Sequence, residues 1–318
     1  NNLTNYQLEL LKNVLIIQFQ NIEITILTDE IKKKEEQDTN EKFINSFLSA
    51  KEIEGCSQRT ISYYKENIQR LISKLEKPIK GITTEDIRNY LSEYKEINNC
   101  GSVTIDNIRR VFSSFFAWLE DEDYIIKSPV RRIHKVKTAS IIKETFTDEN
   151  IEKMRDECKN IRNLAIIELL ISTGMRVGEL VNLNIEDLNF EDRSCVVQGK
   201  GNKQREVYFD ARTKIHLMQY LNIRKDDNKA LFVSKNKPHQ RLSISGIELI
   251  VRKIGIKTDV NRVHPHKFRR TLATMAIDKG MPIEQVQKLL GHVKIETTMH
   301  YAMVNQNNVK ISHRKYIG

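Results

Sequence analysis

The sequence predicts a mainly α-helical protein with one small β-sheet, divided into two domains. Apolar residues recur at helical spacing along most of the chain, and one stretch, residues 193–209, alternates around a Gly-rich turn as a β-hairpin does. The 318 residues are more than one domain usually contains and are enough to bury two cores. We expect a helical N-terminal domain followed by a mixed α/β domain.

Composition narrows the class of protein. Apolar residues make up 39% of the sequence and charged residues 30%, as in globular proteins, and we find no apolar run of transmembrane length and no signal-peptide pattern. The four cysteines are scattered without metal-ligand spacing, which predicts a reduced, cytoplasmic chain. The richness in Lys, Ile and Asn predicts an AT-rich bacterial source. The net charge of +10 favours a nucleic-acid partner, and a merely basic protein is the other interpretation.

Residues 1–37 are predicted to be an N-terminal helical extension. Leu8, Leu11, Leu15 and Phe19 fall on one face of a helix, and a stretch of mixed charge follows them. We expect this apolar face to pack on a partner protomer or on the next domain.

Residues 38–125 are predicted to form a domain of four helices. Ser57 and Thr83 are suited to the N-caps of the second and third helices, and the fourth follows Ser102. Four aromatic residues of the last helix are predicted to lie in the core: Phe112, Phe115, Phe116 and Trp118. The basic residues of these helices are candidates for phosphate contacts or, equally, ordinary solvated side chains: Arg59, Lys65, Arg70, Arg109 and Arg110.

Residues 126–144 are predicted to be a basic linker. Pro129 blocks a helix there, and the run has no hydrophobic period. Such a segment is suited to follow the backbone of a duplex between two domains. Its candidates for phosphate contacts are Arg131, Arg132 and Lys135.

Residues 145–306 are predicted to form the second domain, with a polar tail at 307–318. The apolar residues 164–171 predict a buried helix that ends near Gly174, and Arg176 follows at the start of a short helix. The need for a soluble surface does not by itself explain an Arg at the start of a helix that directly follows a buried segment. Glu179, three residues further on, is placed to orient it.

The predicted hairpin carries Lys200 and Lys203 near its tip. The surrounding sequence is not a Walker A loop, because GxxxxGK[ST] is absent. These lysines are suited to enter a minor groove or to donate a proton to a leaving oxygen, and a solvated turn is the ordinary alternative. The rest of the domain is predicted to contain a helix at residues 213–225, a strand at 230–234, a basic loop at 235–241 and a further helix at 243–255. The candidates for phosphate contacts in the loop are Lys235 and Arg241.

Residues 264–301 hold the polar clusters on which the functional prediction depends. His266 with Arg269, Gly291 with His292, and Tyr301 lie at the ends of two apolar-periodic helical segments. The helix break between those segments is predicted at Gly280-Met281-Pro282. Helix ends can bring such residues to one point.

Their side chains suit the chemistry of a phosphodiester. Arg is a planar, permanently charged clamp for the oxygens of the phosphate, His moves protons near neutral pH, and a Tyr hydroxyl can form a covalent intermediate. Taken singly, each residue has an ordinary structural interpretation. The order of all these residues along one chain favours a functional interpretation.

This order resembles the tyrosine recombinase, or phage integrase, family, and looks most like its Xer-type members. The matching pieces, in the family's order, are TGMRVGEL, VVQGKGNKQREV, HKFR, LLGH and TTMHY. They extend from about Thr147 to Val304. The preceding helical block is similar to the family's core-binding, SAM-like domain but carries no sharp motif.

The resemblance implies a site-specific recombinase that closes around duplex DNA. Tyr301 would attack the scissile phosphate to form a 3′-phosphotyrosyl bond, and strands would be exchanged through a Holliday junction. Arg176 and Arg269 would hold the non-bridging oxygens of the phosphate, and Lys200 would donate a proton to the leaving oxygen. His266 would act in proton transfer, and His292 would donate to a non-bridging oxygen.

The resemblance also implies the partners and the absence of cofactors. The expected partner is duplex DNA with an inverted-repeat core site, on which the protein assembles into dimers and tetramers, with a partner recombinase or accessory protein as a further possibility. Neither metal, ATP nor another cofactor is expected, since the phosphotyrosine conserves the bond energy. The same steps serve integration, excision, inversion and resolution.

The sequence departs from the family pattern at one position and leaves alternatives open. Many relatives carry a His directly after the second Arg, where this chain has Arg270, a candidate DNA contact together with Lys267. A metal-dependent nickase is one alternative, because His264 and His266 form a His-x-His pair. A DNA-binding protein without catalysis is the other, and a type IB topoisomerase would share the chemistry without the tetramer.

Overall fold

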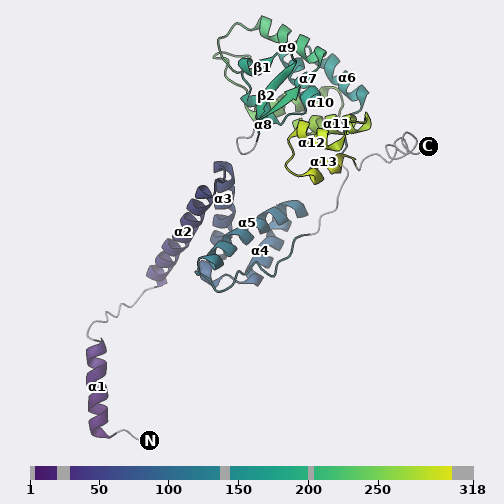
Figure 1. Ribbon diagram of the computed structural model, residues 1–318. Coiled ribbons are helices and arrows are strands. Elements are labelled where there is room, and N and C mark those ends of the chain that lie inside the picture. The colour runs from purple at the N-terminus through teal and green to yellow at the C-terminus, as the bar shows by residue number, and fades with distance from the viewer. Residues whose placement is uncertain (1–3, 20–28, 137–143, 200–203, 303–318) are drawn as a thin grey trace, which may run out of the picture. The chain divides into compact units, whose positions relative to one another are not determined.

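The computed structural model describes residues 4–19, 29–136, 144–199 and 204–302, and the chain divides into two compact units, 1–140 and 141–318 (Figure 1). The division falls inside the segment predicted to be a linker. No helix of the described ranges is long and apolar enough to cross a membrane.

The first unit is built of helices only within its described residues. They are α1 (Asn5–Phe19), α2 (Asp29–Ile53), α3 (Gln58–Leu75), the 3-10 helix η1 (Ile79–Gly81), α4 (Thr84–Ile97) and α5 (Ser102–Asp121). Ser57 caps α3, and Thr83 forms a capping box with Asp86 at the start of α4, as predicted. Helix α2 begins before residue 38, where the sequence placed the start of the helical domain.

Helix α5 supplies the centre of this unit's core. Phe112, Phe115 and Phe116 are fully buried, and α5 packs against α2, α3 and α4. Phe47 of α2 meets Phe115 edge to face, with ring centroids 5.2 Å apart. Trp118 packs at the margin of the same cluster, so the predicted core role of these aromatic residues is confirmed.

Helix α1 carries the predicted apolar face. Leu8, Leu11 and Leu15 are all exposed, and the side chain of Phe19 lies outside the described residues. Their contact with a partner protomer or with the next domain stays a prediction.

The second unit packs one face of a small antiparallel sheet against helices and leaves the other face exposed. Its elements are α6 (Asp148–Glu157), α7 (Ile161–Thr173), α8 (Val177–Asn182), the 3-10 helix η2 (Ile185–Asp187), β1 (Leu188–Asn189), β2 (Ser194–Gln198), β3 (Gln204–Tyr208), α9 (Ala211–Ile223), α10 (Ile244–Lys257), α11 (Pro265–Asp278), α12 (Ile283–Leu290) and α13 (Ile295–Ala302). The strand order is β1-β2-β3, and the predicted hairpin is β2 with β3, in which Val197 pairs with Arg205.

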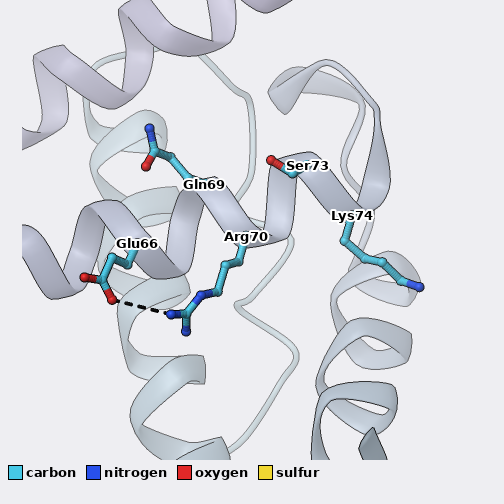
Figure 2. Close-up of a pocket in the computed structure, with 5 residues that line it drawn as sticks. All are labelled: Glu66, Gln69, Arg70, Ser73 and Lys74. Carbon is cyan, nitrogen blue, oxygen red and sulfur yellow. Dashed lines mark ion pairs between the residues drawn. The ribbon is translucent and has the colours of Figure 1, made fainter. Parts of the chain in front are cut away.

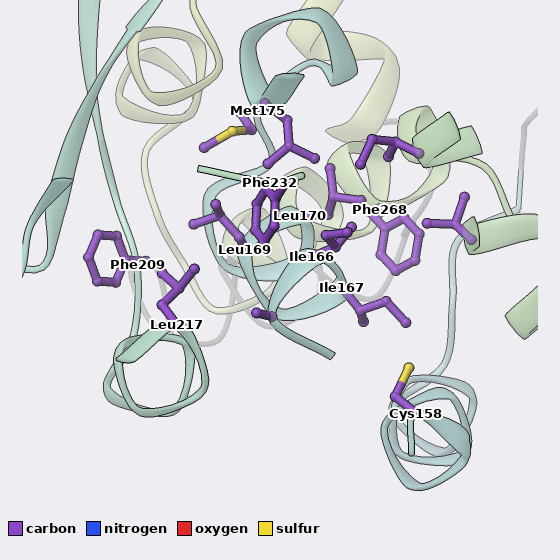
Figure 3. Close-up of a cluster of buried hydrophobic side chains, with 14 of the residues drawn as sticks. Cys158, Ile166, Ile167, Leu169, Leu170, Met175, Phe209, Leu217, Phe232 and Phe268 are labelled. Carbon is purple, nitrogen blue, oxygen red and sulfur yellow. The ribbon is translucent and has the colours of Figure 1, made fainter. Parts of the chain in front are cut away.

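Helix α7 is the centre of the second unit. It packs against α9, α11 and β3, and its residues 165–170 are fully buried, as the apolar run predicted. Figure 3 shows Ile166, Leu169 and Leu170 among the side chains of the surrounding core, with Phe268 of α11 beside them. The predicted break after α11 is confirmed, since α11 ends at Asp278 and α12 begins at Ile283.

The strand predicted at residues 230–234 was wrong. Ala230 and Val233 each form one isolated bridge, with Asn184 and Arg241 respectively, and neither belongs to the sheet. Their apolar side chains are buried because the segment crosses the core as a loop, and burial rather than strand pairing produced the apolar pattern.

Candidate active site

Arg176 stands at the junction of α7 and α8. Gly174 ends α7 in the left-handed conformation, with φ of 58°, and a Cβ there would lie 2.7 Å from a side-chain carbon of Leu272. This tight turn leaves Arg176 as the N-cap of α8. Its guanidinium donates from Nη1 to Glu179 Oε1 at 2.8 Å and from Nη2 to the carbonyl of Gly291 at 3.3 Å.

Glu179 is a buried carboxylate held by two arginines. Its Oε2 also accepts from the backbone N–H of Arg176 at 2.7 Å, so the carboxylate contacts Arg176 at both its backbone and its side chain. Arg205 of β3 makes a bidentate pair with the carboxylate, at 2.6 Å and 2.7 Å. Burial acts to raise the pKa of Glu179, but the hydrogen bonds from Arg205 and Arg176 outweigh it and hold the net pKa below its usual value.

Arg269 of α11 is almost fully buried, with 1% of its surface exposed. Its Nη1 donates to the carbonyl of Gly174 at 2.9 Å, its Nη2 donates to the carbonyl of Leu290, and its Nε has no hydrogen-bond partner among the described residues. Burial, followed by repulsion from Arg176 and Arg205, lowers the pKa of Arg269 to about 10. The guanidinium therefore stays charged at neutral pH, with one buried N–H unsatisfied.

Three arginines meet at the C-terminus of α12. The carbonyls of Leu289, Leu290 and Gly291 accept from Arg205, Arg269 and Arg176 respectively. The last carbonyls of a helix lack partners within the helix and carry a partial negative charge, which suits three cations. One helix end thus holds cationic side chains from β3, α11 and the start of α8.

His292 follows this helix end directly. Gly291 adopts φ of 64° as the C-cap of α12, and the ring of His292 then stacks on Tyr301 with centroids 5.9 Å apart. Its Nδ1 lies 2.8 Å from Oγ1 of Thr298 on α13. Burial, followed by the charges of Arg269 and Arg176, lowers the pKa of His292 to about 4, so the ring is neutral at pH 7.

Tyr301 lies on α13 and packs on the small core made by α11 and α12. Burial lowers the pKa of both Arg269 and Arg270, and the nearby hydroxyl of Tyr301 acts against this shift in each of them. His266, in the first turn of α11, is exposed and lies near enough to His292 to lower the pKa of that ring. The structure thus gathers Arg176, Arg269, His266, His292 and Tyr301.

Lys200 and Lys203 lie outside the described residues, between Gln198 at the end of β2 and Gln204 at the start of β3. Among the described residues, no group of three or more His, Cys, Asp or Glu side chains is placed to hold a metal ion.

The structure also shows two polar residues of this site that the sequence did not single out. Arg205 shares the buried face of β3 with Val207, and a charged residue at such a position is the signal that would have found it. Thr298 is fully buried one helical turn before Tyr301, but nothing in the sequence distinguishes it from its neighbour Thr297.

Most of the predicted DNA contacts are exposed, and some are bound to other groups of the protein. The exposed residues are Arg59, Lys65, Arg110, Arg131, Arg132, Lys135, Lys235 and Arg241, of which Arg131 pairs with Glu120 at 3.3 Å. Helix α3 also presents a shallow hollow of about 530 Å³ lined by Glu66, Gln69, Arg70, Ser73 and Lys74, where Arg70 pairs with Glu66 at 3.5 Å (Figure 2).

Besides Arg131, four of the predicted contacts have partners within the protein. Lys267 is 5% exposed, and its Nζ donates to the carbonyl of Asn261 at 3.0 Å while lying 4.6 Å from the ring centroid of Phe146, which argues against a contact with DNA. Arg109 pairs with Asp106 at 2.9 Å. The other two donate to backbone carbonyls: Arg241 to those of Val181 and Leu183, and Arg270 to that of Glu144.

Comparison with known proteins identifies the family. Residues 144–308, just over half of the chain, match the model of the Phage integrase family. The chain belongs to the phage integrase family. Residues 43–126 match the Phage integrase, N-terminal SAM-like domain, so the two domain types predicted from the sequence are confirmed.

The relatives of this integrase-family chain are tyrosine recombinases. It is 28% identical over 280 residues to Tyrosine recombinase XerA of Pyrococcus horikoshii, an alignment that covers 87% of this chain and 94% of the relative. It is 30% identical over 278 residues to Tyrosine recombinase XerC of Staphylococcus aureus, covering 83% and 93%. The chain is therefore an enzyme of the tyrosine recombinase type, which cleaves and rejoins DNA.

Solved structures support the fold of this tyrosine recombinase. XerH site-specific recombinase bound to palindromic difH substrate aligns with a TM-score of 0.69 at 20% identity, over 94% of this chain and 93% of that one. A lambda integrase dimer bound to a COC′ core site aligns with a TM-score of 0.67 at 18% identity, over 93% and 86%. At these identities the likeness supports the architecture.

Proposed function

We propose that the chain is a site-specific recombinase whose nucleophile is Tyr301. The observation that carries the proposal is the arrangement at the end of α12, where Arg176 and Arg269 bind successive carbonyls and His292 stacks on Tyr301. This arrangement puts charge and donors beside a phenol. In the transition state of the transfer the phosphorus is trigonal-bipyramidal, and both positive charge and hydrogen-bond donors stabilise its oxygens.

The reaction follows from the roles of these groups. The Oη of Tyr301 attacks the scissile phosphorus, its proton passes to His266, and the bond to the 5′-oxygen breaks. Arg176, Arg269 and His292 hold the non-bridging oxygens, and the role of Arg269 is supported by its buried Nε, which has no hydrogen-bond partner among the described residues. Lys200 supplies the proton that leaves with the 5′-hydroxyl, and a 3′-phosphotyrosyl bond remains.

The proposed substrate is duplex DNA with an inverted-repeat core site, on which two protomers bind and two such dimers exchange strands through a Holliday junction. The structural relatives support this proposal, because one is a dimer on a core site and another is bound to a palindromic substrate. The exposed basic residues of the first unit and of residues 131–135 are its proposed phosphate contacts. The relatives come from bacteria and from an archaeon, so the bacterial source and the cytoplasmic location remain predictions.

Covalent trapping tests the proposal. The protein is incubated in EDTA with a nicked duplex that carries the flanks of its own gene, and the products are separated on a denaturing gel. We expect a slow protein–DNA band with a free 5′-hydroxyl, which is lost in Tyr301→Phe. Tyr208→Phe is the matched control, because Tyr208 is an exposed tyrosine whose hydroxyl binds Glu206.

Two outcomes would contradict the proposal. A band that requires added metal and leaves a 5′-phosphotyrosine would support the nickase that uses His264 and His266. Binding to a verified site without any covalent band, in wild type as in Tyr301→Phe, would support the non-catalytic DNA-binding protein.

A further inference from the structure

Thr298 is hydrogen-bonded to the neutral histidine and lies on the same helix as the proposed nucleophile. It is on α13, one turn before Tyr301, with none of its surface exposed. Its Oγ1 is 2.8 Å from Nδ1 of His292. No solvent reaches this hydroxyl, so its proton must go to a protein acceptor or remain unsatisfied.

The direction of this hydrogen bond follows from the burial of Thr298. Among the described residues, the bond to His292 is the only hydrogen bond found for its side chain. A hydroxyl has one proton to donate, and leaving a buried O–H without an acceptor is unfavourable. The hydroxyl therefore donates, and Nδ1 of His292 accepts.

The ring of His292 carries a single proton. Burial disfavours its charged form, and the charged groups that face it, Arg269, Arg176 and Arg205 together with His266, act in the same direction. A neutral imidazole has one donor nitrogen and one acceptor nitrogen. When Nδ1 accepts, the proton is on Nε2.

We propose that Thr298 is a positioning residue that fixes the tautomer of His292, so that Nε2–H is aimed as a donor at the scissile phosphate. The proposal rests on the role proposed above for His292. The opposite tautomer would present a lone pair to a phosphate oxygen and repel it. Because Thr298 and Tyr301 share α13, the phosphate donor is set in its working form only when the helix of the nucleophile is docked.

The first test needs no DNA. The protein is labelled with ¹⁵N-histidine, and a long-range ¹H–¹⁵N spectrum reads the tautomer of His292, assigned by comparison with His292→Gln. We expect the Nε2–H form in wild type and in Thr298→Ser, and a mixture or the Nδ1–H form in Thr298→Val, which keeps the shape but lacks the hydroxyl. Thr297→Val is the matched control, because Thr297 is exposed on the same helix.

An Nδ1–H form in wild type, or an unchanged Nε2–H form in Thr298→Val, overturns the proposal. If Thr298→Val does not fold, the wild-type and Thr298→Ser spectra still decide, because both must show the Nε2–H form.

The second test is single-turnover cleavage of the nicked duplex at saturating DNA. We expect Thr298→Val to cleave at least about tenfold more slowly with unchanged DNA affinity, since loss of one transition-state donor typically slows a reaction by that much or more. Thr298→Ser should restore the rate. Equal rates in wild type and Thr298→Val overturn the proposal. Absence of cleavage in wild type would instead contradict the proposed function, while the tautomer in the spectrum still decides whether Thr298 sets it.

Discussion

Gly291 is the position at which a single methyl group should disturb the whole candidate site. A Cβ there would lie 2.8 Å from Cδ, 3.1 Å from Nε and 3.3 Å from Cζ of Arg205. Arg205 cannot simply swing away, because its guanidinium is held by both oxygens of Glu179 and by the carbonyl of Leu289. We therefore expect Gly291→Ala to break at least one of these hydrogen bonds.

The chain offers a matched control in Gly280. Gly280 is also left-handed, with φ of 90°, but a Cβ there would meet nothing within 4 Å. Gly280→Ala should lower the free energy of unfolding by about 1–2 kcal/mol, the cost of a left-handed non-glycine residue. Gly291→Ala adds about 1.5–3 kcal/mol for a lost charge-assisted hydrogen bond, for a total of about 2.5–5 kcal/mol.

Urea denaturation measures both variants, and Arg205→Ala completes the cycle. In the Arg205→Ala background the extra cost of Gly291→Ala should disappear, so that the two glycine positions become equally sensitive. The reasoning is refuted if Gly291→Ala and Gly280→Ala cost the same in the wild-type background. It is refuted equally if the excess at Gly291 survives the removal of Arg205.

Three further predictions concern the charged groups. Arg269→Lys should slow formation of the covalent adduct at least about 100-fold in single-turnover cleavage, because a point charge cannot reach the carbonyls of Gly174 and Leu290 together; a wild-type rate would contradict the clamp. The pKa of His292 is lowered from 6.5 to about 4, so the unfolded state takes up a proton at a higher pH than the folded state. In urea titrations His292 should leave the free energy of unfolding unchanged with pH above 6.5 and lower it as the pH falls to 4, by less than about 3 kcal/mol because solvent screens the half-buried ring; this decrease should be absent in His292→Gln. Lys267→Met should leave the salt dependence of DNA binding unchanged, since its amine is buried; a shallower slope would restore Lys267 as a phosphate contact.

The sequence predicted those site residues that are tied to helix boundaries. Gly174 and Gly291 end helices in the left-handed conformation, and Arg176 and His292 follow them within two residues. Such boundaries are local in sequence, so capping rules and period are enough to place the residues at helix ends.

Residues whose role depends on distant contacts were harder to predict. Arg205 binds Glu179 and Leu289, which are far from it in the chain, and only the strand register brings them together. Lys267 is polar and was predicted to be at the surface, yet it shares a helix face with the buried Thr271 and Thr274. That face is polar but interior, and a pattern that separates only apolar from polar residues cannot recognise it.

The last turn of α12 determines how the site can come apart. Because it accepts from Arg205, Arg269 and Arg176 through three successive carbonyls, local unfolding of this one turn would remove one hydrogen bond from each of the three side chains in a single cooperative event and leave them held by Glu179 and Gly174 alone. The amide protons of Gly291 and His292 bond to Lys288 and Gln287 in the same turn. Their hydrogen exchange therefore reports the opening of this turn, and a phosphate bound at the proposed site should slow the exchange of both amides together.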